Sequence, residues 1–123
     1  MTDQDSYWHA QIQQVMPDLV IKQYRLHREG LVNDVLIVND EWVFRFTKTD
    51  WGKELMDLED RLMRFIQPHL TLSIPSPEKR MDGVLVYPYL RGEIFLRETW
   101  VKADTKQQQK LADQLGLFLY ELH

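Results

Sequence analysis

A strand, a tight turn, a second strand and a helix are predicted in succession between Gly30 and Glu59, and this stretch constrains the fold more than any other. The turn is Asn39-Asp40, because such a pair between two β-branched or aromatic runs is typical of a β-hairpin. The first run covers residues 32–38 and the second covers residues 41–47. The pattern favours an α+β fold that is built around an antiparallel sheet.

One cation, Arg45, lies in the middle of the second apolar run. Side chains alternate along a strand, so Arg45 shares a face with Val43 and Thr47, while the aromatic side chains of the run point to the other face. An unpaired charge in such a place is costly, and an anionic partner is therefore expected. The helix that follows offers Glu59 for this role.

That helix is predicted from the residues after Asp50, which is a plausible N-cap. One apolar face is formed by side chains at helical spacing, namely Leu55, Leu58, Leu62, Phe65 and Ile66. Glu59 lies at the edge of this face, so its carboxylate can point back toward the sheet. The alternative is a solvated Glu59 that pairs with Arg61, with Arg64 or with nothing.

The other elements are predicted from shorter signals. A leading helix over residues 7–15, with Ser6 as its N-cap, has a rough apolar stripe and is expected to pack on the sheet. A first strand is predicted over residues 19–27. Prolines make residues 73–77 an extended connector, and the Asp82-Gly83 turn precedes an apolar strand that begins at Val84.

The last helix is predicted from Asp104 or Thr105 to the end of the sequence. Five apolar side chains share one of its faces, namely Leu111, Leu115, Phe118, Leu119 and Leu122. Exposure of all five to water would be unfavourable, and a large apolar patch usually marks an interaction surface. A twofold homodimer through this helix is therefore expected.

Composition excludes several classes of protein. With 123 residues the chain can form one small domain, and a net charge of −4 argues against a nucleic-acid surface. The absence of cysteine excludes disulfides and thiolate metal sites. No apolar run reaches the roughly 18 residues that a membrane span requires. The start is polar and acidic, unlike a signal peptide, so a cytoplasmic protein is expected.

Several pieces of the sequence, in order, resemble the N-terminal lobe of the aminoglycoside phosphotransferase and choline kinase family, which has a protein-kinase-like fold. The pieces are residues 30–35, residues 42–46, Leu58-Glu59, and residues 74–75, 84–92 and 119–123. The resemblance implies a lobe at residues 1–90 with a sheet of about five antiparallel strands, a leading helix and an αC-like helix. Residues 91–123 would then leave the hinge and form the first helix of a C-terminal lobe.

The resemblance also implies a site for ATP or GTP with Mg²⁺. Gly30 and Asn33 would belong to the turn over the phosphates, and Arg45, where the family carries Lys or Arg, would bind the phosphates and be oriented by Glu59. Val35 and Val43 would line the adenine, and Tyr87 would stand behind it. The Pro88 carbonyl and the Leu90 N–H would recognise its edge, and this role for Pro88 requires only an acceptor.

The family's catalytic His-Gly-Asp run, with its following Asn and metal-binding Asp, has no counterpart in the 123 residues. No catalytic residue or magnesium ligand can therefore be assigned, and the 123 residues alone are expected to be inactive. The parent would be an ATP- or GTP-dependent phosphotransferase acting on a hydroxyl of a small molecule that the sequence does not reveal. The alternative is a non-catalytic kinase-like module that binds another protein.

Overall fold

The predicted hairpin forms at the centre of the sheet in a computed structural model that describes residues 1–92 and 95–123. Strands β2 (Asn33–Val38) and β3 (Trp42–Thr47) pair antiparallel. Asn39 and Asp40 both have positive φ, 56° and 52°, as a two-residue hairpin turn of this hand requires. The Asp40 carboxylate also accepts a hydrogen bond of 2.7 Å from Arg25, which ties the turn to the neighbouring strand.

Three further strands complete the sheet: β1 (Tyr24–His27), β4 (Glu78–Met81) and β5 (Val84–Pro88). The five strands lie in the order β1-β2-β3-β5-β4, and every neighbouring pair is antiparallel. The α+β class and the five-stranded sheet are thus confirmed. Strand β1 is shorter than predicted.

The longer helices begin at side chains that satisfy their first N–H groups. In α1 (Asp3–Val15), Thr2 and Asp5 bond each other's backbone N–H groups in a capping box, so the predicted cap at Ser6 is wrong. In α2 (Asp50–Ile66) the cap is Thr49, one residue before the predicted Asp50. A short 3₁₀ turn, η1 (Gln67–His69), follows α2.

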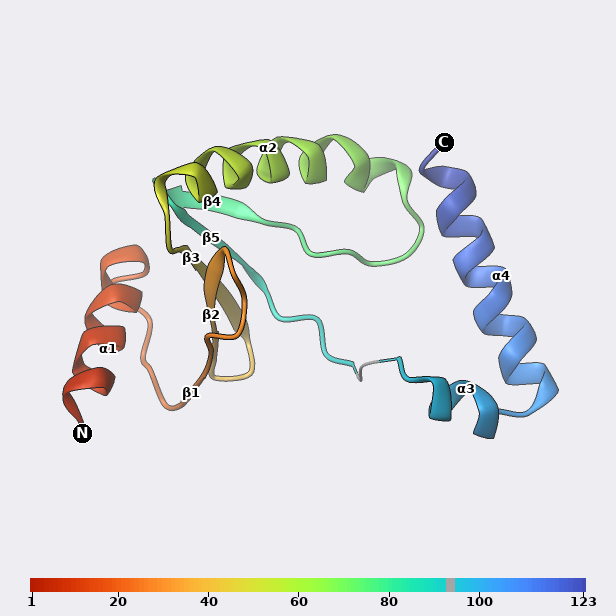
Figure 1. The fold of residues 1–123 in the computed structure, drawn as a ribbon, viewed down its shortest axis with the longest axis horizontal. Coiled ribbons are helices and arrows are strands. Elements are labelled where there is room, and N and C mark those ends of the chain that lie inside the picture. The colour runs from red at the N-terminus through yellow and green to blue at the C-terminus, as the bar shows by residue number, and fades with distance from the viewer. Residues whose placement is uncertain (93–94) are drawn as a thin grey trace.

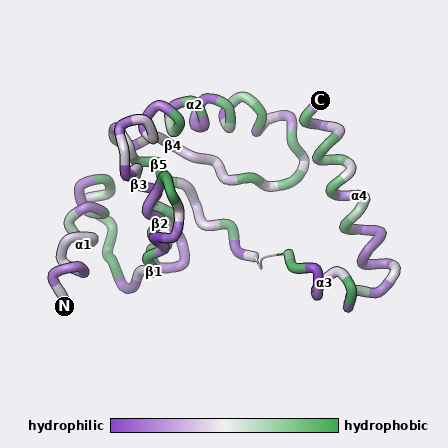
Figure 2. Tube along the Cα trace, viewed as in Figure 1, coloured by the Kyte–Doolittle hydropathy of each residue, from purple (hydrophilic) through white to green (hydrophobic). Residues whose placement is uncertain are grey.

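Two helices come after the sheet, and the shorter of them, α3 (Arg97–Lys102), was not predicted. The second is α4 (Thr105–Glu121), which begins where predicted and has Asp104 as its N-cap. The tube view shows apolar and polar positions alternating along α4, which stands away from the sheet (Figure 2). Among the described residues, no helix is both long and apolar enough to cross a membrane.

The core lies between α1 and one face of the sheet, as expected for the leading helix. Trp8 and Ile12 of α1 are buried and belong to the same cluster as Phe44 and Phe46 of β3. The rings of Trp8 and Phe46 are 5.6 Å apart. This face is therefore filled, and the opposite face, which carries Arg45, is left to α2 and to solvent.

Helix α2 does not bury the apolar face that the sequence predicts. The buried side of α2 carries Gly52 and Met56. Of the five predicted side chains, Ile66 is half-buried and the other four are about half or more exposed: Leu55 48%, Leu58 56%, Leu62 53% and Phe65 73%. Gly52 allows the close approach, because a Cβ there would be 3.2 Å from a methyl group of Val32. We call Leu55, Leu58, Leu62 and Phe65 the α2 stripe.

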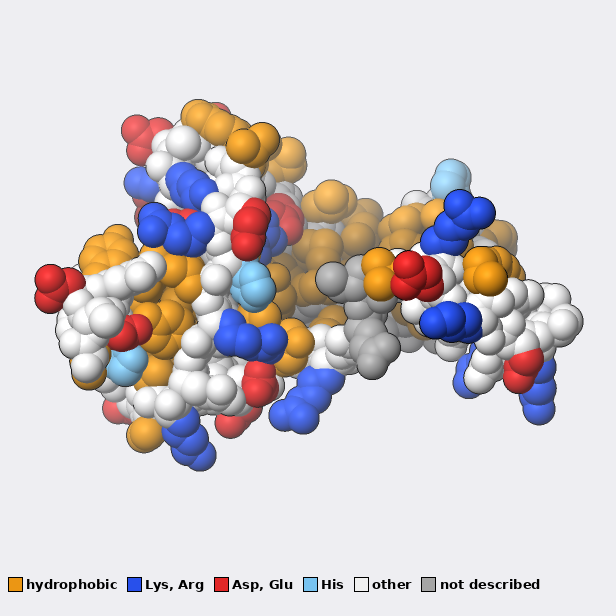
Figure 3. Space-filling model, turned by 60° about the horizontal axis from the view of Figure 1, so that its bottom comes forward, with side chains coloured by type: hydrophobic (Ala, Val, Ile, Leu, Met, Phe, Trp, Pro, Cys, Tyr) orange, Lys and Arg blue, Asp and Glu red, His pale blue; other side chains and the backbone are white. Residues whose placement is uncertain are grey.

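Helices α3 and α4 stand apart from the sheet (Figure 1). The end of α4 returns to the segment after α2, where the Glu121 carboxylate accepts bonds of 3.0 and 2.8 Å from the N–H and hydroxyl of Thr71. The space-filling view shows hydrophobic side chains gathered between the sheet and the α3–α4 part (Figure 3). On the predicted α4 face, Leu115, Leu119 and Leu122 are 57%, 49% and 42% exposed.

Candidate functional site

Arg45 and Glu59 form a bidentate ion pair between β3 and α2. The two guanidinium nitrogens Nη1 and Nη2 donate to Oε1 and Oε2 at 2.5 and 2.9 Å. The side chain of Arg45 is 20% exposed and that of Glu59 is 38% exposed. The alternative of a solvated Glu59 is wrong, because Glu59 is bonded to Arg45, and Arg64 pairs with Asp60. The predicted ion pair is confirmed.

The surroundings of Arg45 keep it charged. Burial alone would lower the pKa of the guanidinium, but the hydrogen bonds and negative charge of Glu59 outweigh that effect and raise it. The hydroxyl of Tyr87 lies close enough to Arg45 and Glu59 for their charges to affect its pKa. Burial raises the pKa of this hydroxyl, the positive charge of Arg45 lowers it, and the negative charge of Glu59 raises it, with a net increase. The site thus holds a permanent cation in a fork that is geometrically fixed.

Strand register brings the other apolar site residues to the face of Arg45. Val35 and Arg45 are directly opposite in β2 and β3, and Val43 is opposite Tyr87 of β5. Val43 is 5% exposed, whereas Val35 and Tyr87 are half-buried. The result is an apolar sheet surface beside a fixed cation.

The segment after β5 presents the predicted backbone acceptor. The N–H of Tyr89 donates to the Glu41 carbonyl on the β3 side at 2.8 Å. Because the peptide bond is trans and planar, the Pro88 carbonyl points the opposite way, away from β3. Pairing between β4 and β5 reaches only Val86 among the described residues, so β4 does not cover this carbonyl. Leu90, two residues on, is 45% exposed.

The turn between β1 and β2 lies at the other end of this surface. A Cβ on Gly30 would be only 3.0 Å from the Asn33 carbonyl, so the turn is tight there. The buried Oδ1 of Asn33 has no hydrogen-bond partner within the described part of the chain. A hollow of about 170 Å³ is lined by Val32, Asn33, Arg45, Gly52, Leu55, Met56 and Glu59. The turn, the cation and α2 therefore enclose one small space.

Sequence reasoning missed Lys48, which follows β3 and reaches the same turn. Its ammonium donates to the carbonyls of Arg28 and Gly30 at 3.0 and 2.6 Å. No motif in the sequence predicts this role for Lys48, because a lysine after a strand is common. Only the fold brings its side chain to the turn.

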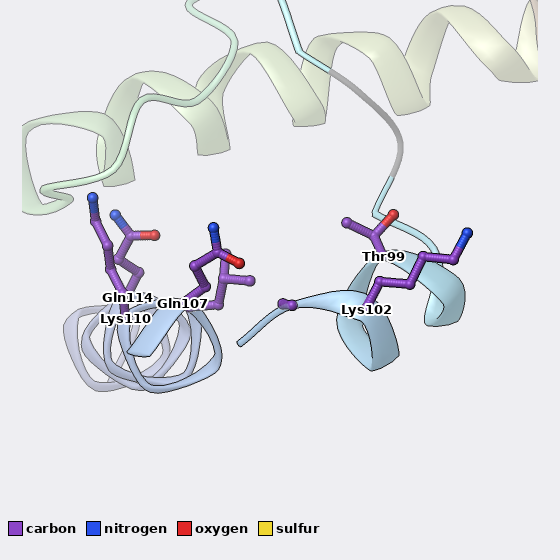
Figure 4. A pocket seen from close by; sticks show the side chains of 7 residues that line it. Thr99, Lys102, Gln107, Lys110 and Gln114 are labelled. Carbon is purple, nitrogen blue, oxygen red and sulfur yellow. The ribbon is translucent and has the colours of Figure 1, made fainter. Parts of the chain in front are cut away.

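Of the larger hollows that lie away from Arg45 in the described part of the chain, one of about 790 Å³ runs along α4, and two more are formed by α4 with other segments. One of these two, of about 630 Å³, is formed between α3 and α4, where Figure 4 shows the side chains of Thr99 and Lys102 from α3 and of Gln107 and Lys110 from α4. The other, of about 540 Å³, is almost wholly apolar and is lined by Leu72, Phe95, Trp100, Leu111, Ala112, Gln114 and Leu115. Neither is lined by a predicted site residue.

Carboxylates are scattered over the described residues. No group of three or more histidine or acidic side chains there could hold a metal ion. The site around Arg45 contributes a cation and backbone groups, and Glu59 is committed to Arg45.

Comparison with known proteins identifies the family. Residues 23–123 match the family described as "Phosphotransferase enzyme family". The chain belongs to this family. A comparison with curated protein sequences returned no match.

Solved structures of aminoglycoside phosphotransferases match almost the whole chain. The GDP complex of aminoglycoside 2'-phosphotransferase-IIIa is 28% identical with a TM-score of 0.79, and the match covers 95% of this chain and 41% of that one. ADP-bound APH(2'')-Ib is 27% identical with a TM-score of 0.80, covering 99% and 40%. The streptomycin–ATP–APH(2")-IIa complex is 25% identical with a TM-score of 0.83, covering 100% and 41%. The chain thus spans about 40% of the length of these proteins.

Proposed function

We propose that this chain is the nucleotide-binding lobe of an ATP- or GTP-dependent phosphotransferase. The observation that carries the proposal is the bidentate Arg45–Glu59 pair, which fixes a cation beside the apolar sheet face of Val35 and Val43. The base of the nucleotide would lie on Val35 and Val43, with Tyr87 behind it. Relatives in the family were solved with GDP, ADP and ATP, which supports a nucleotide as the ligand.

Each group has a distinct role in this proposal. The Pro88 carbonyl and the Leu90 N–H would bind the edge of the base, at the end of β5. Arg45 would bind the phosphates and stabilise the charge on the transferred group, and Glu59 would hold the guanidinium in place. Gly30 and Asn33 would belong to the turn over the phosphates.

The rest of the reaction is assigned to residues outside these 123. Residues 1–90 would form the N-terminal lobe, and residues 91–123 would lead into a second lobe that holds the catalytic base. The described carboxylates do not fit a magnesium site, so the ligands of the Mg²⁺ that such reactions use would also come from that lobe. The acceptor would be a hydroxyl of an aminoglycoside, because relatives were solved with streptomycin, kanamycin and gentamicin.

Titration calorimetry of the 123-residue chain with ATP and GTP tests the binding role. Half a cleft buries only part of a ligand, so we expect weak binding, with a dissociation constant of about 100 μM or higher. We also expect no transfer of a phosphoryl group to an aminoglycoside. Arg45→Met should abolish nucleotide binding, and Arg64→Met, which removes an exposed guanidinium that pairs with Asp60, should not. Equal binding by the Arg45→Met variant, sub-micromolar affinity of the wild type, or turnover by this chain would contradict the proposal.

The exposed α4 face supports a homodimer of the 123-residue chain. Leu115 and Leu119 are about half exposed, and α4 stands apart from the sheet (Figure 1). Sedimentation at micromolar concentration should show a dimer for the wild type and a monomer for Leu115→Asp and Leu119→Asp. A wild-type monomer would refute the dimer.

A non-catalytic module that binds another protein is the second candidate, and the exposed α2 stripe is the observation that favours it. The two functions differ in their dependence on Arg45. A protein-binding module would lose its partner when Leu58→Asp interrupts the stripe and would be indifferent to Arg45→Met. A nucleotide-binding lobe would show the opposite pattern in the calorimetric titration.

A further inference from the structure

Lys48 is bonded to the turn between β1 and β2 through its side chain and its backbone. Its Nζ donates to the Arg28 carbonyl at 3.0 Å and to the Gly30 carbonyl at 2.6 Å, and lies 3.5 Å from Oδ1 of Asp34. Its own N–H donates to the Val32 carbonyl at 2.9 Å. The ammonium thus donates to two carbonyls of the turn and forms an ion pair with Asp34, which Arg28 also approaches at 3.5 Å.

The side of the sheet on which this ammonium lies can be derived from the register. Asp34 alternates with Leu36 and Val38 in β2, and those two side chains are buried in the core against α1. The ammonium beside Asp34 is therefore on the α1 side. Arg45, which is opposite Val35, is on the other side.

The peptide geometry then places two free donors. In a trans peptide the carbonyl of one residue and the N–H of the next point in opposite directions. Because the carbonyls of Arg28 and Gly30 point to Lys48, the N–H groups of Glu29 and Leu31 point away from it, toward the Arg45 side. Neither N–H donates a hydrogen bond within the described part of the chain.

We propose that Lys48 is a positioning residue that aims the backbone N–H groups of Glu29 and Leu31 at the phosphates of the nucleotide. The inference rests on the proposed function of the site. Glycine-rich turns give phosphates access to backbone N–H groups because they lack side chains, but this turn has a single glycine. Here an ammonium on the far side holds the carbonyls back, so the donors are oriented before the ligand arrives and binding costs less ordering of the chain.

The test compares ligands with and without phosphates on the 123-residue chain. We expect Lys48→Met to weaken the binding of ATP or GTP, and of inorganic tripolyphosphate, by about tenfold. This factor corresponds to the loss of roughly one charge-assisted hydrogen bond. Affinity for adenosine or guanosine should change less than about twofold, since hydrogen bonds to the base do not involve the turn. Lys48→Arg should recover part of the loss. The matched control is Lys53→Met, whose exposed ammonium pairs with Asp50 and Asp82 and touches no turn carbonyl.

The amide signals of Glu29 and Leu31 give a second readout. In the wild type they should shift on titration with tripolyphosphate and not with the nucleoside, and the shift should be lost in Lys48→Met. Equal weakening of nucleoside and triphosphate would show a merely structural role and overturn the inference, as would unchanged triphosphate affinity. Failure of the wild type to bind any nucleotide or tripolyphosphate would instead overturn the proposed function, and the inference with it.

Discussion

The Arg45–Glu59 pair should contribute a coupling free energy that a surface ion pair does not. Two unit charges about 4 Å apart attract by about 4 kcal/mol at an effective dielectric constant near 20. Glu59 is 38% exposed, so water screens part of this attraction, and desolvation of Arg45 offsets another part. A hydrogen bond to a charged group contributes about 1.5–3 kcal/mol net, and we expect a coupling of about 2 kcal/mol for the pair.

A double-mutant cycle in urea unfolding measures this quantity. The variants are Arg45→Met, Glu59→Gln and the double variant, and the cycle removes effects that each change has by itself. The control cycle uses Lys53→Met and Asp82→Asn, whose exposed side chains approach to 3.6 Å and should couple by at most about 0.5 kcal/mol. A coupling for Arg45 and Glu59 no larger than that of the control would refute the idea that α2 is held to the sheet by this pair.

Three other outcomes follow from the structure. The hydrogen bond from Tyr24, and then those with Thr2, lower the pKa of Asp5 to about 2 from 3.8, so Asp5 adds stability above about pH 4 that is lost as the pH falls through 2. The same bond raises the pKa of Tyr24 to about 12 from 10.0, so its contribution to stability is present below pH 10 and is lost as the pH rises through 12. In the Tyr24→Phe variant, the thermal stability should depend less on pH at both the acid and the alkaline end. Unchanged pH dependence at both ends would contradict this. Phe44→Ala should cost about 3–5 kcal/mol in urea unfolding, because Phe44 is fully buried, and a loss under 1 kcal/mol would show that it is not in the core. A Cβ at residue 52 would be 3.1 Å from Oγ1 of Thr49, so Gly52→Val should move α2 away from the sheet. The variant should lower nucleotide affinity as much as Glu59→Gln does. Full affinity in calorimetry would show that the neighbouring side chains shift to make room for the valine.

Local signals in the sequence are strong where one or two residues decide the geometry. Asn39 and Asp40 tolerate positive φ, so the hairpin could be predicted. The alternation of side chains along β3 then places Arg45 on the face that α2 contacts. The N-caps of the helices were harder to predict, because several adjacent residues can cap a helix. Thr2 is chosen over Ser6 by its reciprocal bonds with Asp5, and such a pair three residues apart can be recognised in a sequence.

The orientation of α2 could not be predicted from its apolar pattern. The pattern favours Leu58 and Leu62 as core residues, but the structure buries Gly52 and Met56 and directs Glu59 to Arg45. An ion pair and a close helix–sheet approach decide the orientation, and both depend on contacts far apart in the sequence. The role of Lys48 has the same origin, since its partners at residues 28 and 30 are distant along the chain.

Chemical-shift mapping of the 123-residue chain with ATP and GTP tests the central claim most directly. A nucleotide in the proposed site should shift the signals of the Val35, Val43 and Leu90 backbone amides and of the Arg45 guanidinium, all on one sheet face and its edge. The shifts should disappear in Arg45→Met. Shifts confined to the hollow between α3 and α4, or none at millimolar nucleotide, would contradict the assignment of this sheet face as the nucleotide site.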